Sequence, residues 1–311
     1  MRVLFMLSFN PNCQRNNLKY FDYFVKNVTS WMNKLYNKRE GSKEEALKLA
    51  FNFVTDNVDV SVNGRVATVK MNRPEALNAL NKEMIKGLIS SLKEISESDG
   101  IDILVLTGTE KAFSAGGDIK AMLVLGDDEQ EFYSIMDCIN ELVITLYNFP
   151  AITISAVSGP ASGLGFSLAL ATDYILARED AKLAMNFIGI GLIPDGGAHF
   201  FLAKMIGESM AKQLVWEGKT LNAHEAYTQG LIHEVASDLD TALTEKIHSY
   251  LKKPVQAMIK TKLILAELNR PKLLKVLELE KYAQRKMSET KDHREGIKAF
   301  VEKRAPKFTG R

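Results

Sequence analysis

Two glycine-rich segments, residues 113–118 and 159–165, each lie between a run of apolar residues and a helical pattern. The first N–H groups of a helix have no intrahelical partner and lie at the positive end of its dipole, and glycine lets a ligand approach them closely. Two such segments can direct their N–H groups at one oxygen, as in an oxyanion hole. The pattern predicts stabilisation of a developing negative charge, although tight turns and helix packing also use glycine.

A third segment of this kind, residues 193–197, carries the acid Asp195. Its carboxylate can accept and return a proton, but Asp before two glycines at a helix start is also a natural N-cap, and the sequence leaves both roles open. His199 can share a helix face with Asp195 and tune it, but in apolar surroundings packing is its expected role. Asp118 and Asp173 are expected to cap helices or to bond backbone groups.

The elements around these segments follow the pattern of an α/β protein. Alternating β-branched residues on both sides of Asn63 and Gly64 predict a hairpin over residues 58–71 with a type I′ turn. Three later strands are continuously apolar, which is typical of parallel strands that are buried on both faces. They cover residues 103–107, 152–157 and 174–177.

Helical periodicity fills the spaces between these strands. Asn81 is expected to cap a helix with apolar residues on one face, and a second helix is predicted over residues 129–148. A helix of small residues is predicted at 166–172. After residue 206 the pattern is helical to the end of the chain, with a capping box at residues 222–225.

Composition narrows the class of protein. Of the 311 residues, 46% are hydrophobic and 25% are charged, as in a globular protein with a sizeable core. No stretch approaches the roughly 18 consecutive apolar residues that a membrane helix needs. Cys13 and Cys138 are far apart and in no metal spacing. We therefore expect neither a disulfide framework nor a zinc ribbon. We do expect a cytoplasmic location.

The basic residues gather at the N-terminus. Residues 1–39 hold seven Lys or Arg and one acid, which leaves 33 basic and 37 acidic residues, a net charge of −4, for the rest. That body does not indicate a nucleic-acid surface. A basic amphipathic helix is predicted at 17–38, followed by a capping box at Ser42 and Glu45. A partner- or membrane-surface helix, a targeting segment and an appended helix of little role are the alternatives, and we favour the last.

Five motifs recur in the order of one known family. They are MNRPEALNAL (71–80), AFSAGGDIK (112–120), AVSGPASGLGFSL (156–168), GLIPDGG (191–197) and REGIKAFVEKR (294–304). Through them the chain resembles the enoyl-CoA hydratase/isomerase (crotonase) family over residues 58–311. The resemblance implies an α/β fold with a crotonase-like ββα spiral core at 56–250, a helical C-terminal trimerisation region at 251–311, and an N-terminal extension at 1–55.

The resemblance also implies a chemistry. Members bind an acyl-CoA thioester whose carbonyl becomes an enolate, and they assemble as homotrimers or dimers of trimers. CoA is part of the substrate, and no metal or other cofactor is implied. The N–H groups of Gly117 and Leu164 match the two donors that hold the thioester oxygen. The family usually has glycine where this chain has Leu164, so the leucine side chain is expected to point away from the thioester.

Six further positions match residues that contact CoA in the family. Two of them match positions that meet the CoA of a neighbouring subunit, and four match contacts to adenine and pantetheine. The first two are Phe300 and Lys303, and the other four are Ala76, Leu77, Ala115 and Ile119.

The chain departs from the family at the two glutamates that hydratases carry. Ser167 and Phe187 stand at these positions, and neither is a carboxylate base such as hydration needs. Ser167 is expected to pack within its helix. Asp195 stands where members that move a double bond can carry a single catalytic acid, so the sequence predicts a Δ3,Δ2-enoyl-CoA isomerase. An enoyl-CoA hydratase that uses Asp195 and a member that binds acyl-CoA without turnover remain alternatives.

Overall fold

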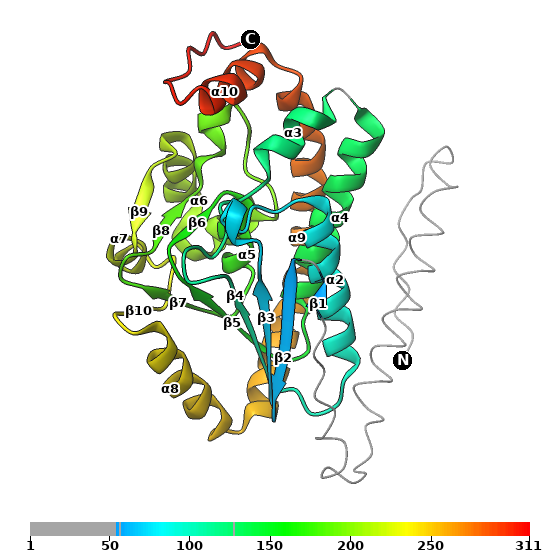
Figure 1. The fold of residues 1–311 in the computed structure, drawn as a ribbon. Helices are drawn as coiled ribbons and strands as arrows, with labels where there is room; N and C mark the ends of the chain where they lie inside the picture. Colours follow the sequence, from blue (N-terminus) through cyan, green and yellow to red (C-terminus); the bar gives the residue numbers. More distant parts are fainter. Residues whose placement is uncertain (1–53, 56, 127) are drawn as a thin grey trace, which may run out of the picture. The chain divides into compact units, whose positions relative to one another are not determined.

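The apolar runs predicted as strands lie side by side in one mixed sheet (Figure 1). The computed structural model describes residues 54–55, 57–126 and 128–311. The first three strands pair antiparallel, and each later neighbour pairs parallel, so the predicted α/β architecture is confirmed. The order in the sheet is β1 (Val54–Thr55), β2 (Val58–Asn63), β3 (Val66–Met71), β4 (Ile103–Thr107), β5 (Ile152–Val157), β7 (Tyr174–Arg178) and β10 (Glu234–Ala236).

The hairpin of β2 and β3 is confirmed, but its turn is not the predicted type I′. Asn63 pairs with Val66, so Gly64 and Arg65 form the two-residue loop. Gly64 has a φ of +58°, whereas Arg65 does not have a positive φ. A type I′ turn needs positive φ at both central residues, and a type II′ turn needs it only at the first. The two central residues of the turn are therefore Gly64 and Arg65, one residue later than the predicted pair of Asn63 and Gly64.

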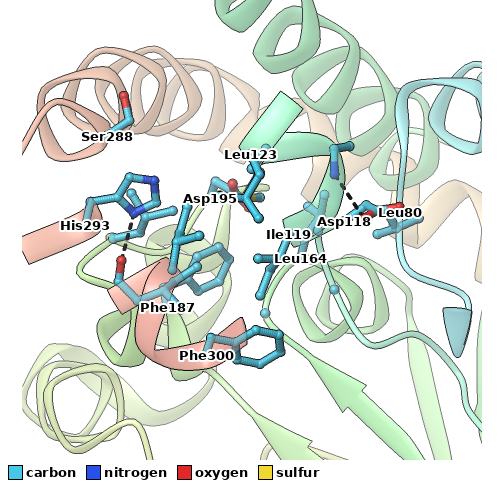
Figure 2. A pocket seen from close by; sticks show the side chains of 18 of the residues that line it. Leu80, Asp118, Ile119, Leu123, Leu164, Phe187, Asp195, Ser288, His293 and Phe300 are labelled. Carbon is cyan, nitrogen blue, oxygen red and sulfur yellow. Dashed lines mark hydrogen bonds between the residues drawn. The ribbon is translucent and has the colours of Figure 1, made fainter. Parts of the chain in front are cut away.

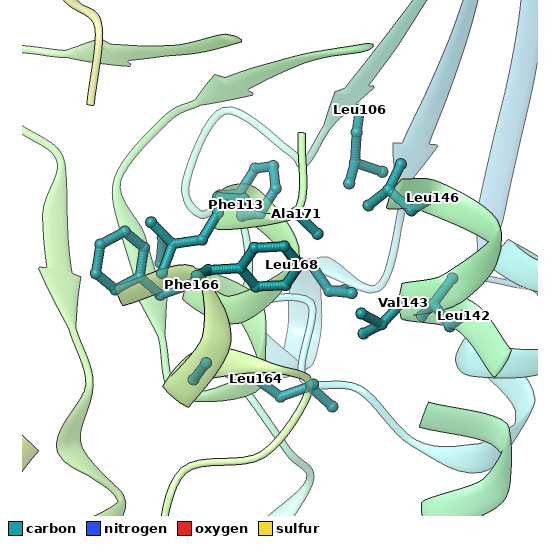
Figure 3. Close-up of a cluster of buried hydrophobic side chains, with 14 of the residues drawn as sticks. Leu106, Phe113, Leu142, Val143, Leu146, Leu164, Phe166, Leu168 and Ala171 are labelled. Atoms are coloured by element: carbon teal, nitrogen blue, oxygen red, sulfur yellow. The ribbon is translucent and has the colours of Figure 1, made fainter. Parts of the chain in front are cut away.

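Strands β4 and β5 form the centre of the sheet because their side chains are mostly apolar and almost all buried. The helices α2 (Lys82–Glu97) and α4 (Glu129–Tyr147) pack against each other. Figure 3 shows Leu142, Val143 and Leu146 of α4 gathered with Leu106 of β4 and with Phe166 in one cluster of buried side chains. Burying each such side chain stabilises the fold by roughly 1.5–3 kcal/mol.

The predicted helices occur with small shifts. Asn81 caps α2, since the Met84 N–H donates to Asn81 Oδ1 at 3.0 Å. The small-residue helix, α5 (Leu164–Leu170), begins two residues earlier than predicted, which makes Leu164 its first helical residue. The capping box at residues 222–225 is present at the start of α7 (Ala223–Thr228).

The prediction of a purely helical chain after residue 206 is wrong at two strands and at the end of the chain, where no helix follows Val301 among the described residues. A strand of three residues, β9 (Thr220–Asn222), joins a second sheet, and β10 extends the main sheet beside β7. Three residues are too few to show the period of two that identifies a strand. The second sheet has the order β6 (Pro160–Ser162), β8 (Lys182–Ala184), β9. The remaining α-helices are α3 (Ile119–Leu125), α6 (Ala198–Glu217), α8 (Leu239–Leu251), α9 (Val255–Ser288) and α10 (Lys291–Val301).

Several predictions concern segments outside the described residues. The basic helix at 17–38 and the capping box at Ser42 and Glu45 belong there. The division of the chain at residues 55 and 250 stays a prediction. Within the described ranges, no helix combines the length and the apolar character that crossing a membrane requires.

Candidate active site

Both glycine segments and Asp195 lie on the wall of one cavity of about 710 Å³ (Figure 2). Helices α2, α3, α4, α9 and α10 contribute side chains to the same wall. Most of the side chains contributed by α2 and α4 are apolar. They include Ile85, Phe132, Ile135, Met136 and Ile139. The cavity therefore suits a ligand with an apolar chain and a small number of polar atoms.

The first glycine segment is held against the chain that precedes α2. The Leu80 N–H donates to the Gly116 carbonyl at 2.7 Å, and the Asp118 N–H donates to the Leu80 carbonyl at 3.2 Å. Gly116 has a φ of +95°, and a Cβ there would lie 2.6 Å from the Ser162 carbonyl oxygen, so only glycine fits. Between these anchors the Gly117 N–H has no acceptor within the described part of the chain.

The second glycine segment ends at the start of α5. Gly163 has a φ of +51°, and its N–H donates to the Ala184 carbonyl at 2.8 Å. Leu164 follows as the first helical residue. Its N–H has no acceptor among the described residues, because the first N–H groups of a helix have no carbonyl one turn earlier in the helix. The Leu164 side chain is buried and packs toward Gly196, where an added Cβ would lie 2.6 Å from Leu164 Cδ1.

Main-chain hydrogen bonds join the two segments to each other. The Ser114 N–H donates to the Pro160 carbonyl at 3.0 Å, and the Ser162 N–H donates to the Ser114 carbonyl at 2.9 Å. Ser114 and Ala161 thereby form a parallel β-bridge. The two free N–H groups, of Gly117 and Leu164, therefore belong to one hydrogen-bonded backbone unit that lines the cavity.

Asp195 is the acid of this wall that has no ion-pair partner in the part of the chain that the structure describes. The residue is 4% exposed, and its Oδ2 accepts a hydrogen bond from Gln284 Nε2 at 3.1 Å. Its Oδ1 has no hydrogen-bond partner among the described residues. Burial raises the pKa of the Asp195 carboxyl to about 7; the Gln284 hydrogen bond opposes this shift, and the nearby Glu280 charge adds to it. Asp195 can therefore bind and release a proton near neutral pH.

The Asp195 side chain does not cap α6, so the structural alternative for this residue is wrong. Glu280, which comes from α9, caps α6 instead: the N–H groups of Gly197 and His199 donate to its carboxylate at 2.7 and 3.1 Å. The His199 ring also pairs with Glu280, through Nδ1 at 2.7 Å. The buried carboxylate of Glu280 thus caps the positive end of α6. In the described structure the Asp195 carboxyl makes no bond to the helix start and lines the cavity instead.

The two residues at the missing glutamate positions surround Asp195 without supplying a base. Ser167 is fully buried, and its hydroxyl donates to the main-chain carbonyl of Asp195 at 2.9 Å. Phe187 lines the cavity, and its ring lies 3.5 Å from the position of a Cβ on Gly163. Ser167 thus holds the segment that carries Asp195, and Phe187 keeps the wall beside it apolar.

Asp118 and Asp173 have the structural roles that the sequence predicts. Asp118 caps α3 and accepts a hydrogen bond from the Arg73 guanidinium at 2.6 Å. Burial alone would raise the pKa of Asp118, but the hydrogen bonds from Arg73 and from two backbone N–H groups outweigh it and lower the pKa. Asp173 accepts hydrogen bonds from Thr153 and forms an ion pair with the buried Lys262 at 2.7 Å.

Comparison with known proteins decides the family. The family model described as enoyl-CoA hydratase/isomerase matches residues 61–311. The chain belongs to this family. YhaR of Bacillus subtilis (strain 168), whose name places it in the same family, is 47% identical over 252 residues, which is 81% of this chain and 98% of that protein. The 1,2-epoxyphenylacetyl-CoA isomerase of Escherichia coli (strain K12) is 37% identical over 258 residues, with 79% and 95% covered.

A solved structure of the family has the same fold. The crystal structure of an enoyl-CoA hydratase from Mycobacterium avium subsp. paratuberculosis K-10 matches with a TM-score of 0.75 and 31% identity. The match covers 82% of this chain and all of that chain. The predicted crotonase fold with a helical C-terminal region is therefore confirmed, and the chain is a crotonase-family acyl-CoA enzyme.

The six positions matched to the family's CoA contacts divide into two groups. Ala115, Ile119 and Phe300 line the cavity, whereas the other three lie outside its wall. Ala76 and Leu77 lie at η3 (Pro74–Ala76), beside the first glycine segment, because the Ala115 N–H donates to the Leu77 carbonyl at 2.9 Å. Lys303 is exposed just beyond α10. Contacts of these residues with CoA stay predictions.

Sequence reasoning missed the polar residues that α9 and α10 bring to the site. Gln284 and Glu280 reach the Asp195 segment from α9, and His293 lines the cavity from α10 with its Nδ1 at 2.8 Å from the Ile190 carbonyl. A signal for the first two exists in the sequence. They continue the buried stripe of Leu273 and Leu277 at helical spacing, and polar residues in an apolar stripe mark a buried polar contact.

Proposed function

We propose that this enzyme is a Δ3,Δ2-enoyl-CoA isomerase with Asp195 as its proton carrier. One observation carries the proposal: a buried carboxyl group with an unpaired oxygen shares a cavity wall with two free backbone N–H groups. An enolate mechanism needs both features, a base for the carbon acid and donors for the oxyanion. The isomerase name of the Escherichia coli relative supports the same class of reaction.

The mechanism moves one proton along one face of the acyl chain. Ionised Asp195 removes a proton from C2 of a 3-enoyl thioester, and the electrons of the C–H bond pass into a dienolate. The Gly117 and Leu164 N–H groups hold the negative oxygen, each contributing about 3–4 kcal/mol as oxyanion donors do. Neutral Asp195 then returns the proton to C4, so the double bond ends between C2 and C3. Atoms and charge balance without a second acid.

The environment of Asp195 supports this cycle. A carboxyl group whose pKa lies at about 7 is a stronger base than an ordinary aspartate and can also return the proton when it is neutral. The reaction begins with the ionised form. We therefore expect kcat/KM to rise as the pH increases through about 7 and to level off above it.

Hydration has weaker support. The Ser167 hydroxyl is engaged by backbone carbonyls, and Phe187 leaves no second carboxylate in its place. Asp195 alone would have to activate water and also deliver a proton. A protein that only binds acyl-CoA would have no need of a buried carboxyl group, which is costly to keep.

The decisive experiment gives the purified full chain 3-enoyl-CoA and 2-enoyl-CoA in separate reactions. The isomerase is expected to convert the first to the conjugated 2-enoyl thioester, which ultraviolet absorbance and chromatography detect. Rapid hydration of the second substrate without any shift of the first would reject the proposal. Absence of both reactions across several acyl lengths, with acyl-CoA still bound, would favour a binding protein.

The proposal includes assembly and location. Large apolar side chains on α9 are exposed in the single chain, and burial between subunits would remove them from water. This supports association between copies of the chain, and the homotrimer or dimer of trimers is the assembly that the family resemblance implies. We propose a location in the cytoplasm as well. Size-exclusion chromatography with light scattering tests the assembly, and cell fractionation tests the location. The exposed α9 side chains concerned are Ile264, Leu265, Leu268, Leu274, Leu279 and Tyr282.

A further inference from the structure

Helix α9 brings two polar side chains to the segment that carries Asp195. Glu280 and Gln284 lie one helical turn apart, and each is only 3% exposed. Glu280 holds the start of α6, and Gln284 donates to Asp195 Oδ2 at 3.1 Å. The two residues therefore fix the main chain and the side chain of the same segment from a single rigid helix.

The contact between Gln284 and Asp195 leaves atoms unpaired. Asp195 Oδ1 and Gln284 Oε1 are both buried without a hydrogen-bond partner in the described structure. A buried polar atom in this state is destabilising, and an apolar side chain at 284 would avoid part of the cost. Both residues line the cavity, which points to a role in the reaction rather than in folding.

We propose that Gln284 is a positioning residue for Asp195: its carboxamide N–H holds Oδ2, so that Oδ1 is the oxygen that exchanges the proton with the acyl chain. The proposal rests on the proposed function, because it assumes that Asp195 carries the proton. A carboxylate that is free to rotate would present either oxygen in many orientations. One fixed oxygen keeps the reacting atoms aligned, and loss of alignment on the scale of 1 Å can slow a reaction about 100-fold.

The same helix also acts on the charge of Asp195. A hydrogen bond to the carboxylate favours its ionised form, and the Gln284 contact lowers the pKa. The Glu280 charge disfavours a second negative charge nearby and raises it, while His199 on α6 lowers it. The two α9 residues therefore shift the titration of Asp195 in opposite directions.

The first test replaces the donor with an apolar side chain. In Gln284→Leu, kcat for 3-enoyl-CoA is expected to fall about 10- to 100-fold while KM stays nearly constant, because alignment is lost and binding is not. The pKa of the rising limb of kcat/KM is expected to move to higher pH. An unchanged kcat and pH profile would overturn the proposal.

The second test uses the neighbour with the opposite influence. Glu280→Gln keeps a side chain that can accept from the α6 N–H groups but removes the charge, so the pKa of the rising limb should move to lower pH. Urea unfolding of each variant measures how far the fold is affected. Shifts in the same direction for both variants would contradict the assignment.

A matched control lies on the same helix. Gln256 of α9 donates to the buried carboxylate of Asp102 at 2.6 Å, and neither residue lines the cavity. Gln256 is exposed, and Gln256→Leu removes a carboxamide contact to a buried carboxylate away from the cavity, so it is expected to leave the pH profile unchanged. If Gln256→Leu and Gln284→Leu behave alike, the effect belongs to α9 packing and the proposal fails. Should Gln284→Leu not fold, the nearly isosteric Gln284→Glu is used, and it too is expected to move the profile to higher pH by adding a charge.

A double variant separates this inference from the proposed function. If Asp195→Asn leaves only a small residual rate and Gln284→Leu does not lower that rate further in the double variant, the two residues act as one unit. If Asp195→Asn is inactive but Gln284→Leu is as active as the parent, only the positioning role fails. If Asp195→Asn remains fully active, the proposed function itself fails.

Discussion

Asp118 and Asp195 are both buried acids beside a pair of glycines, and both line the same cavity, yet their pKa values shift in opposite directions. Asp118 has a guanidinium and two backbone N–H groups as partners, so its charge is fully compensated. Asp195 has one carboxamide donor and no cation. Asp195 is the more deeply buried of the two acids, and its fewer, uncharged partners add to this difference, so Asp195 is the one that keeps its proton near neutral pH.

The difference assigns different work to two similar segments. Asp118 fixes the first glycine segment, because it ties α3 to Arg73 and stands next to Gly117. Asp195 fixes nothing with its side chain, and Glu280 does the capping in its place. Under the proposed function, a sequence in which both acids stand beside Gly-Gly contains one structural and one reactive carboxyl group.

The largest expected effect comes from removing the reactive acid. In Asp195→Asn, kcat for isomerisation should fall about 10²- to 10⁴-fold, since an amide cannot take the C2 proton. Calorimetry with a CoA thioester should show binding close to that of the parent. A variant that retains more than about a tenth of the parent rate would remove the contrast between the two acids.

The structural acid should show its effect in stability. Asp118→Asn removes the buried anion that faces the Arg73 guanidinium and leaves Arg73 with only the exposed Glu75, while asparagine can still cap α3, so the free energy of unfolding in urea should fall by about 2 kcal/mol. The exposed pair of Arg178 and Asp180 supplies a control, in which Asp180→Asn should cost about 0.5 kcal/mol or less. Equal losses in the two variants would show that the Arg73 contact is no stronger than a surface pair.

A smaller effect links the pKa of Asp195 to stability. The folded protein holds this proton up to pH about 7, whereas an unfolded aspartate releases it near 3.8. The folded state therefore binds more protons between these values, and stability falls as the pH rises through this window. Asp195→Asn lacks this loss, so by pH 8 its stability relative to the parent should have risen by roughly 1–2 kcal/mol compared with pH 6. Parallel stability curves for the two proteins would contradict a raised pKa.

Local patterns in the sequence were sufficient for most of the fold. Continuous apolar runs predicted β4, β5 and β7, and the caps at Asn81 and at residues 222–225 predicted two helix starts. The sequence did not predict the strands β9 and β10, because each has only three residues and is defined by its pairing with another strand. The hairpin turn was displaced by one residue because the choice between Gly64 and its neighbours depends on strand register, which the local pattern does not determine.

The site was predictable where its parts are local and unpredictable where they are distant. The glycine segments and Asp195 are marked by their own residue types. The partner of Asp195 comes from a helix 89 residues further along the chain, so no local pattern connects the two. The sequence does not decide whether Asp195 caps α6, for the same reason. The residue that does cap this helix, Glu280, lies 83 residues from Gly197.

The β-bridge between Ser114 and Ala161 has a consequence for how members of this fold can diverge. Main-chain hydrogen bonds between the two segments hold the proposed oxyanion donors at a spacing that most side-chain substitutions would leave intact. New reactions can then arise by substitution of side chains at or near the cavity wall, such as those at 167, 187 and 195, while the two N–H donors keep their positions. The backbone of the two glycine segments can then stay the same between members of the family, while selection acts on the side chains that line the cavity beside them.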